Sequence, residues 1–416
     1  MYRLLFLFIL ISALPAAAQS ENSNVRPATN TVNSTNSNQN YSIPDTTRLE
    51  FYKLEEMEET EVTKEISTKA SRADKKQLEK NNSTDLQQSS VSIPISDTPA
   101  SSSLMMQQQF ESNQVNSSRQ YSRRSASPIE QMNMDQSVQY YQAVQPESFE
   151  THFYTYLAGH YNVDLYPELE AAALLAPENT EVKKQEAAYF IINSETPAAL
   201  VKIGELVEEN IITKGQLAYA NDLLVSGQET NAIIVTHGFE DMLSAYYVQN
   251  QLGVRPDVQL LSLDFMQSEK YRSDRAGEGL VLPESEVIDT AYLANLCASN
   301  ADRNLQLSLT LPKDYLLGMK EKLYPVGLTF MYSETPVDNF SENSDLWYSS
   351  MKKELVSKPM NDSGDKWSAN YLPMIVTLRK QLVLLNETGK VKELDKIILD
   401  LGARNNAKEK VKKYTY

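Results

Sequence analysis

The feature that most constrains this chain is a change of composition near residue 145. Residues 19–145 are dominated by Ser, Asn, Gln, Thr, Glu and Lys, with few large apolar side chains and no sustained hydrophobic period. Such a segment cannot bury enough apolar surface to offset the chain entropy lost on folding. We therefore expect it to be low-complexity and mostly disordered, and we expect the folded core to come from the residues that follow.

The first residues have the three parts of a secretory signal peptide. Arg3 gives a basic start, residues 4–13 form an apolar run, and residues 16–18 are three alanines typical of a cleavage site. The apolar run is shorter than the roughly 20 residues of a membrane-spanning helix, and no later stretch is apolar enough to cross a bilayer. We expect cleavage after residue 18 and an exported protein without a transmembrane segment. We place it in the periplasm, with outer-membrane association and secretion as alternatives.

The net charge and the cysteine content argue against nucleic-acid binding and against an intramolecular disulfide. The chain carries a net charge of -16, and residues 117–124 form only a small basic patch. We therefore predict no nucleic-acid partner, because phosphate binding needs clustered positive charge. Cys297 is the only cysteine, which excludes an intramolecular disulfide, and its apolar neighbours favour a buried, inert thiol.

Residues 146–228 alternate helical stretches with turn signals. Pro177 and Asn179 separate two helices, and small residues such as Ala171 and Ala187 recur along the section. The turns fall about twenty to thirty residues apart, which is typical of helical hairpins of the tetratricopeptide kind. No strict repeat of that pattern is present, so an irregular helical layer is the alternative.

Residues 229–335 alternate strands with helices. Four apolar runs predict strands, at residues 231–238, 257–266, 305–311 and 324–332. Helices are predicted between them, at residues 241–253, 284–299 and 312–323. Alternation of this length indicates βαβ connections, and hence a small, mainly parallel, Rossmann-like sheet covered on both faces.

Residues 336–416 are predicted to be helical again. Helices are expected at residues 346–356, 367–389 and 390–402, with Gly389 and Gly402 as stops. The last two helices are expected to form a hairpin. The predicted fold class is therefore α/β with flanking helical hairpins.

The first predicted strand ends in a cluster of polar side chains, where open α/β sheets usually bind ligands. His237, Glu240 and Asp241 follow that strand, and Asp264 lies towards the end of the next one. If the two strands are adjacent and parallel, these four side chains converge on one edge of the sheet. Carboxylates with an imidazole bind a divalent cation or act as acid and base.

The alternative is that the same residues are structural. Glu240 and Asp241 would cap the following helix, while a hydrogen bond would hold His237. We favour this alternative because no Ser or Cys has the setting of a nucleophile, no two-His ligand spacing appears, and one glycine cannot form a phosphate-binding loop. We therefore predict no catalytic residue and no cofactor. The four residues remain candidates for ligand binding.

Residues 216–271, 291–338 and 378–399, taken in order, resemble the soluble C-terminal region of a family of large bacterial membrane proteins. Those proteins carry a multi-spanning N-terminal half related to protein O-mannosyltransferases, and their overall role is poorly defined. The family's turn after the first strand is similar to Thr-Asn-Gly-Asp-Asn-Asp, of which this chain keeps Thr236, Gly238 and Asp241. The membrane half is missing here, so the resemblance implies no glycosyl transfer.

Two functions of different class follow from the sequence. The first is an exported, non-enzymatic cell-envelope protein that acts as an interaction or assembly module for an envelope protein partner, with the polar N-terminal segment as a tether or as a segment that folds on the partner. The second is a divergent metal- or glycan-binding domain, or a hydrolase, that uses His237, Glu240, Asp241 and Asp264.

Overall fold

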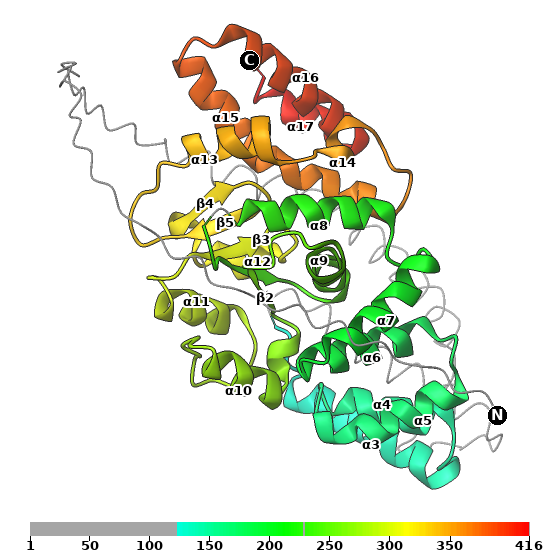
Figure 1. The fold of residues 1–416 in the computed structure, drawn as a ribbon. Helices are drawn as coiled ribbons and strands as arrows, with labels where there is room; N and C mark the ends of the chain where they lie inside the picture. The colour runs from blue at the N-terminus through cyan, green and yellow to red at the C-terminus, as the bar shows by residue number, and fades with distance from the viewer. Residues whose placement is uncertain (1–122, 228, 416) are drawn as a thin grey trace, which may run out of the picture. The chain divides into compact units, whose positions relative to one another are not determined.

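The computed structural model describes residues 123–227 and 229–415 (Figure 1). The predicted signal peptide and most of the segment predicted to be disordered lie outside these residues. The described part is mostly helical and contains one small mixed sheet of five strands. Within it, no helix combines the length and apolarity needed to cross a bilayer.

Six α-helices make up the first section. They are α3 (Pro128–Val144), α4 (Phe149–Ala158), α5 (Tyr166–Leu175), α6 (Thr180–Ile192), α7 (Thr196–Glu208) and α8 (Lys214–Ser226), with the short 3-10 helix η1 (Val163–Leu165) before α5. Helices α3 to α7 pack against their neighbours in sequence. Polar caps begin several of them; Asn179, for example, accepts hydrogen bonds from the first backbone N–H groups of α6.

Helix α3 lies inside the segment predicted to be disordered, so that prediction is wrong for residues 123–144. Ser127 and Glu130 form a reciprocal capping box at its start, and Pro128 occupies the first helical position. Met134, Val138 and Tyr141 bury one side of the helix in a small separate core shared with α4, α5 and α6. This apolar stripe is thin in the sequence, and the packing of α4 stabilises it.

The sheet is mixed, with strand order β2-β1-β3-β5-β4. Its strands are β1 (Ile233–Thr236), β2 (Gln259–Ser262), β3 (Leu305–Ser308), β4 (Leu323–Val326) and β5 (Thr329–Tyr332). Strand β1 is parallel to β2 and β3, whereas β5 is antiparallel to both β3 and β4. The prediction of a mainly parallel, four-stranded sheet is therefore wrong. The run predicted as one strand at residues 324–332 is a tight hairpin, because Gly327 adopts a left-handed φ of 58° that reverses the chain.

Short helices surround the sheet. They are α9 (Phe239–Leu252), η2 (Phe265–Gln267), α10 (Glu269–Gly277), α11 (Thr290–Ser299), α12 (Lys313–Leu317) and η3 (Lys320–Lys322). Figure 1 shows α8 and α9 side by side next to the strands, in agreement with their close packing. Helix α11 begins six residues later than predicted because Asp289 caps it, accepting from the Tyr292 N–H at 2.9 Å. Helix α10 was not predicted.

The last section is helical, as predicted, but more broken. Its elements are α13 (Phe340–Asp345), the π-helix η4 (Leu346–Ser350), α14 (Glu354–Ser357), the 3-10 helix η5 (Ser363–Tyr371), α15 (Leu372–Leu384), α16 (Thr388–Arg404) and α17 (Lys408–Lys412). The helix predicted over residues 346–356 is interrupted at Lys353, whose φ is 56°. Helices α15 and α16 pack against each other.

A single large core joins the sheet to α6–α9, α11 and α15–α17. All four residues of β1 and of β3 are buried, so the middle of the sheet is covered on both faces. Cys297 lies in this core with no exposed surface, which confirms the prediction of a buried thiol. Burial raises the pKa of this thiol, so Cys297 is not a reactive nucleophile.

Candidate functional site

The predicted strand-end cluster lies at the end of β1, where successive strands are added on opposite sides of β1. The chain runs from β1 to β2 on one side and then crosses to β3 on the other side of β1. The loops that follow these three parallel strands therefore meet at one edge. In open α/β sheets such a switch point is the usual place for a ligand.

Asp241 is a buried cap that joins two strand ends. Its carboxylate accepts hydrogen bonds from the backbone N–H groups of His237 at 2.7 Å, Gly238 at 2.9 Å and Met242 at 3.0 Å. The Thr310 hydroxyl, in the loop after β3, donates a fourth. Burial raises the pKa of Asp241, and these four hydrogen bonds oppose the shift. Both carboxylate oxygens are therefore occupied within the chain.

Glu240 does not join the cluster. Its side chain is half exposed and accepts from the Gln216 amide at 3.3 Å and from the Lys366 ammonium at 3.1 Å. Adjacent residues on a helix point in directions about 100° apart, so Asp241 faces the sheet edge while Glu240 faces the neighbouring elements. The prediction that all four side chains converge is wrong for Glu240.

Asp264 is paired with an arginine from the start of the described chain. Arg124 Nε lies 2.8 Å from Asp264 Oδ1, and the Arg124 side chain is only 4% exposed. Arg124 Nη2 also donates to the His237 carbonyl at 3.5 Å. Burial raises the pKa of the Asp264 carboxyl, and the Arg124 charge opposes that rise. The candidate site therefore contains its own cation.

Backbone contacts hold Arg124 in this place. Its N–H donates to the Ile288 carbonyl at 2.6 Å, and the Ile288 N–H donates to the Ser125 hydroxyl at 2.9 Å. Arg123 and Asp289 form an isolated antiparallel bridge beside them. The sequence identified a basic patch at residues 117–124 but nothing that ties Arg124 to a strand end so far along the chain. Sequence reasoning missed Arg124 and Thr310 for this reason.

His237 lies in the cluster as a neutral imidazole. Burial, and then the nearby Arg124 charge, lower its pKa to about 3. Its Nε2 atom is buried without a hydrogen-bond partner, and the hydrogen bonds that hold His237 are those of its backbone N–H to Asp241 and of its carbonyl with Arg124. An imidazole with so low a pKa is a poor general base at neutral pH, because the pKa of an efficient base lies near the working pH.

The described residues contain no group of three or more His, Cys, Asp and Glu side chains that could hold a metal ion. In the cluster, Asp241 accepts hydrogen bonds from four donors, and Asp264 forms an ion pair with Arg124. The arrangement can therefore stabilise the junction of β1, β2 and β3. Comparison of the chain with protein-family models, curated proteins and solved structures gave no match.

Proposed function

We propose that this protein is an exported, non-enzymatic cell-envelope protein whose folded part serves as an interaction or assembly module. The observation that carries the proposal is the closed strand-end cluster: the chain's own donors engage the carboxylates of Asp241 and Asp264, and the imidazole of His237 is neutral. An α/β domain whose switch point is filled in this way lacks the open polar groups that catalysis needs. The alternative, a metal- or glycan-binding domain or hydrolase at that cluster, requires Arg124 to leave Asp264.

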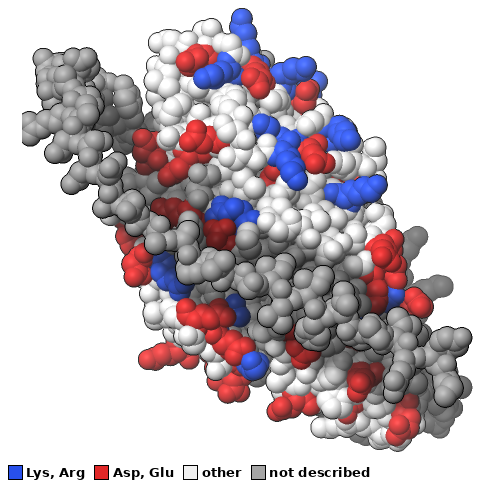
Figure 2. All heavy atoms as spheres, in the orientation of Figure 1, with Lys and Arg blue, Asp and Glu red and all other residues white. Residues whose placement is uncertain are grey.

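An uneven distribution of charge supports a role in protein association. Residues 123–227 contain six Lys and Arg and fifteen Asp and Glu, whereas residues 351–415 contain fourteen and eight. Figure 2 shows Lys and Arg gathered over the C-terminal helices, and Asp and Glu predominating over the N-terminal ones. Surfaces of opposite sign steer partners and suppress wrong pairings. We propose that the acidic helical section meets a basic patch on an envelope protein.

The arrangement of the helices supports the same proposal. Neighbouring helices α3 to α7 pack in sequential pairs, and we propose that they form a tetratricopeptide-like layer, because stacked helix pairs present extended binding faces. We also propose that the β1–α9–β2 unit is Rossmann-like, since its two parallel strands are joined by a crossover helix. Relationship to the soluble region of the bacterial membrane-protein family remains part of this proposal and rests on the sequence resemblance.

The test is a pull-down of envelope extract with the mature chain. The matched baits are a form that begins at residue 123 and a variant of the mature chain with Glu205→Lys and Glu208→Lys on α7. We expect one partner to bind the mature chain and to be lost from the charge-reversed variant at unchanged thermal stability. A partner retained by the reversed variant would contradict the role of the acidic section.

Calorimetry distinguishes the alternative function. We expect titration of the mature chain with Zn²⁺, Mg²⁺ or Ca²⁺ to give no saturable heat. Saturable binding that disappears in both His237→Ala and Asp264→Asn would contradict the proposal and support a ligand site at the strand ends.

A further inference from the structure

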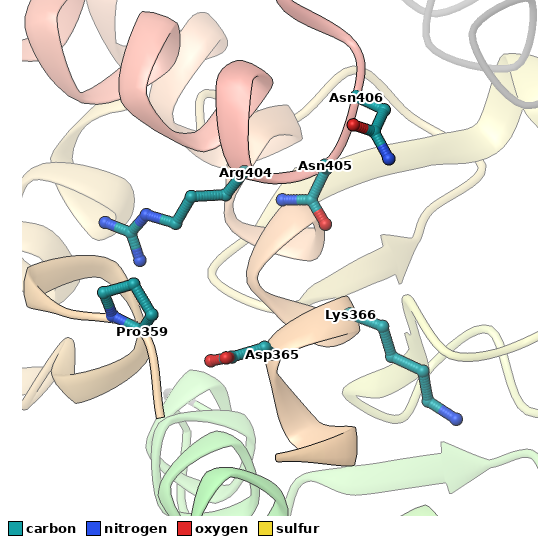
Figure 3. A pocket seen from close by; sticks show the side chains of 6 residues that line it. All are labelled: Pro359, Asp365, Lys366, Arg404, Asn405 and Asn406. Atoms are coloured by element: carbon teal, nitrogen blue, oxygen red, sulfur yellow. The ribbon is translucent and has the colours of Figure 1, made fainter. Parts of the chain in front are cut away.

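A pocket opens between the segment after α14, the start of η5 and the turn that joins α16 to α17. Its volume is about 450 Å³, and six residues line it: Pro359, Asp365, Lys366, Arg404, Asn405 and Asn406 (Figure 3). We call it the C-terminal pocket. Small-molecule sites have volumes of about 300 to 1,000 Å³, so the space accommodates a ligand larger than a single inorganic ion.

Side chain to backbone hydrogen bonds fix the walls of the C-terminal pocket. The Arg404 guanidinium donates to two carbonyls of α14, with an Nη1 to O distance of 2.7 Å at Leu355. Asp365 accepts from the backbone N–H groups of Met360 at 2.7 Å and Asn361 at 2.6 Å. The Asn405 amide nitrogen donates to a serine hydroxyl of η5 at 3.0 Å. The pocket is therefore formed before any ligand arrives, which lowers the entropic cost of binding.

Cations outnumber acids among the residues that line the pocket, in a chain that is negative overall. Lys366 and Arg404 line it, Lys358 immediately precedes Pro359, and Lys408 follows the pocket turn. Asp365 is the one acidic residue among the six that line the pocket, and two backbone N–H groups already stabilise its charge. The Lys366 ammonium pairs with Glu240 at 3.1 Å, so the Arg404 guanidinium is the cation that attracts an anion into the pocket.

The hydrogen-bonding groups define the rest of the ligand. Donors come from the Asn406 amide and from the N–H groups that Arg404 does not use on α14, and Asp365 and the Asn405 carbonyl oxygen are acceptors. The Lys366 ammonium, which pairs with Glu240, lies at the edge of the pocket. Figure 3 shows the Asn405 amide directed towards η5, the Asp365 carboxylate directed towards the Pro359 segment, and the Lys366 side chain leading away from both. The lining contains no aromatic side chain. An anion that also carries several hydroxyl groups matches this mixture of donors and acceptors.

We propose that the C-terminal pocket binds a hydroxylated organic anion, such as a sugar acid or a sugar phosphate. The anionic group meets the Arg404 guanidinium and the Asn406 amide, and the hydroxyl groups donate to Asp365 and Asn405. The site shares no lining residue with the strand-end cluster, and it does not depend on the proposed assembly function.

The first test compares ligands on the mature chain. D-glucuronate, glucose 6-phosphate, glucose and inorganic phosphate are titrated by calorimetry and by tryptophan fluorescence, since Trp367 directly follows Lys366. We expect saturable binding of the two sugar anions, at least about tenfold tighter than that of glucose or inorganic phosphate. Absence of saturable binding of both sugar anions at millimolar concentration overturns the proposal. Equal binding of inorganic phosphate or of glucose overturns it too.

The second test locates the site with charge-matched variants. Lys366→Gln removes a lining cation. Asn406→Asp introduces a negative charge without changing the size or shape of the side chain. Asp also tolerates the left-handed φ of 54° at this position. Lys392→Gln, on an exposed part of α16 outside the pocket, is the control with the same loss of charge.

We expect about tenfold weaker binding of glucuronate for Lys366→Gln and Asn406→Asp, and unchanged binding for Lys392→Gln. Unfolding curves verify that each variant is folded. Equal weakening by Lys392→Gln would show that diffuse surface charge is responsible, and wild-type affinity in both pocket variants would place binding elsewhere. Either result overturns the proposal.

Discussion

The strand-end cluster and the C-terminal pocket both bring charged side chains together, but they use them differently. At the strand ends, Asp241 is buried and the Asp264 side chain is only 15% exposed, and donors of the same chain engage both carboxylates. In the pocket, the bonds made by Arg404 and Asp365 shape the walls, and Lys366 is more than half exposed. A buried charge must be paired because its desolvation costs several kcal/mol, whereas a charge at a wet surface stays available to a ligand. Position in the fold alone therefore does not identify a binding site.

The largest effect is expected at Asp241. Asp241→Ala removes the acceptor of three backbone N–H groups and of the Thr310 hydroxyl. We expect a loss of about 3 to 5 kcal/mol in the free energy of unfolding, since buried donors would be left unsatisfied. Urea denaturation followed by circular dichroism measures it. Asp241→Asn keeps one carbonyl acceptor and should cost less; a loss below about 1 kcal/mol for Asp241→Ala would contradict the structural role.

Arg124 is expected to have the next largest effect. Arg124→Met leaves the partly buried Asp264 carboxylate without its cation, and we expect the free energy of unfolding to fall by about 3 kcal/mol. Adding Asp264→Asn should restore part of that stability, because the unpaired charge is then removed. Arg123→Met is the control: its Nη2 donates to the Ala126 carbonyl, three residues away. Equal effects of the two arginine variants would show that the Arg124–Asp264 pair contributes little.

His237 makes the cluster sensitive to acid. Its folded pKa is about 3, while that of an unfolded histidine is about 6.5. Between these values only the unfolded chain binds the proton, so stability falls as pH falls, by up to about 1.4 kcal/mol per pH unit. The raised pKa values of Asp241 and Asp264 act in the opposite direction. The difference in pH-dependent stability between the wild type and His237→Gln therefore gives the contribution of the histidine alone.

We expect unfolding measurements from pH 7 to pH 5 to show a steeper loss of stability in the wild type than in His237→Gln. Nuclear magnetic resonance of the imidazole C–H provides an independent measurement. A chemical shift that titrates near pH 6.5 in the folded protein would mean that His237 is solvated. That result would contradict the description of the strand-end cluster as closed.

The sequence predicts the strands and the cap for local reasons. Residues 231–238 and 305–311 are continuous apolar runs, and both contain buried parallel strands, β1 and β3. Asp241 stands three residues after Gly238, which is the spacing of a helix cap. The hairpin at residues 324–332 was missed because its apolar pattern continues through the turn, although a glycine inside such a run is a known sign of a bend.

What the sequence does not predict depends on distant partners. Helix α3 is stabilised by contacts such as the edge-to-face packing of Tyr141 on Tyr154, whose ring centroids lie 5.5 Å apart. Arg124, at the start of the described chain, pairs with Asp264 in its middle. The C-terminal pocket combines residues 359–366 with residues 404–406, and neither stretch carries a binding motif. Local periodicity contains no information about which side chains tertiary packing brings together.

The smallest effect is expected at Glu240, the neighbour of Asp241 in sequence. Its ion pair with Lys366 joins side chains that are 52% and 57% exposed, so solvent screens it, and Glu240→Gln should change stability by less than about 0.5 kcal/mol. The same variant releases Lys366, which lines the C-terminal pocket, and removes a negative charge near it. We therefore expect glucuronate to bind Glu240→Gln at least as tightly as wild type in calorimetry. A loss of stability above about 1 kcal/mol, or weaker binding of the sugar acid, would show that the pair belongs to the closed cluster rather than to the open pocket.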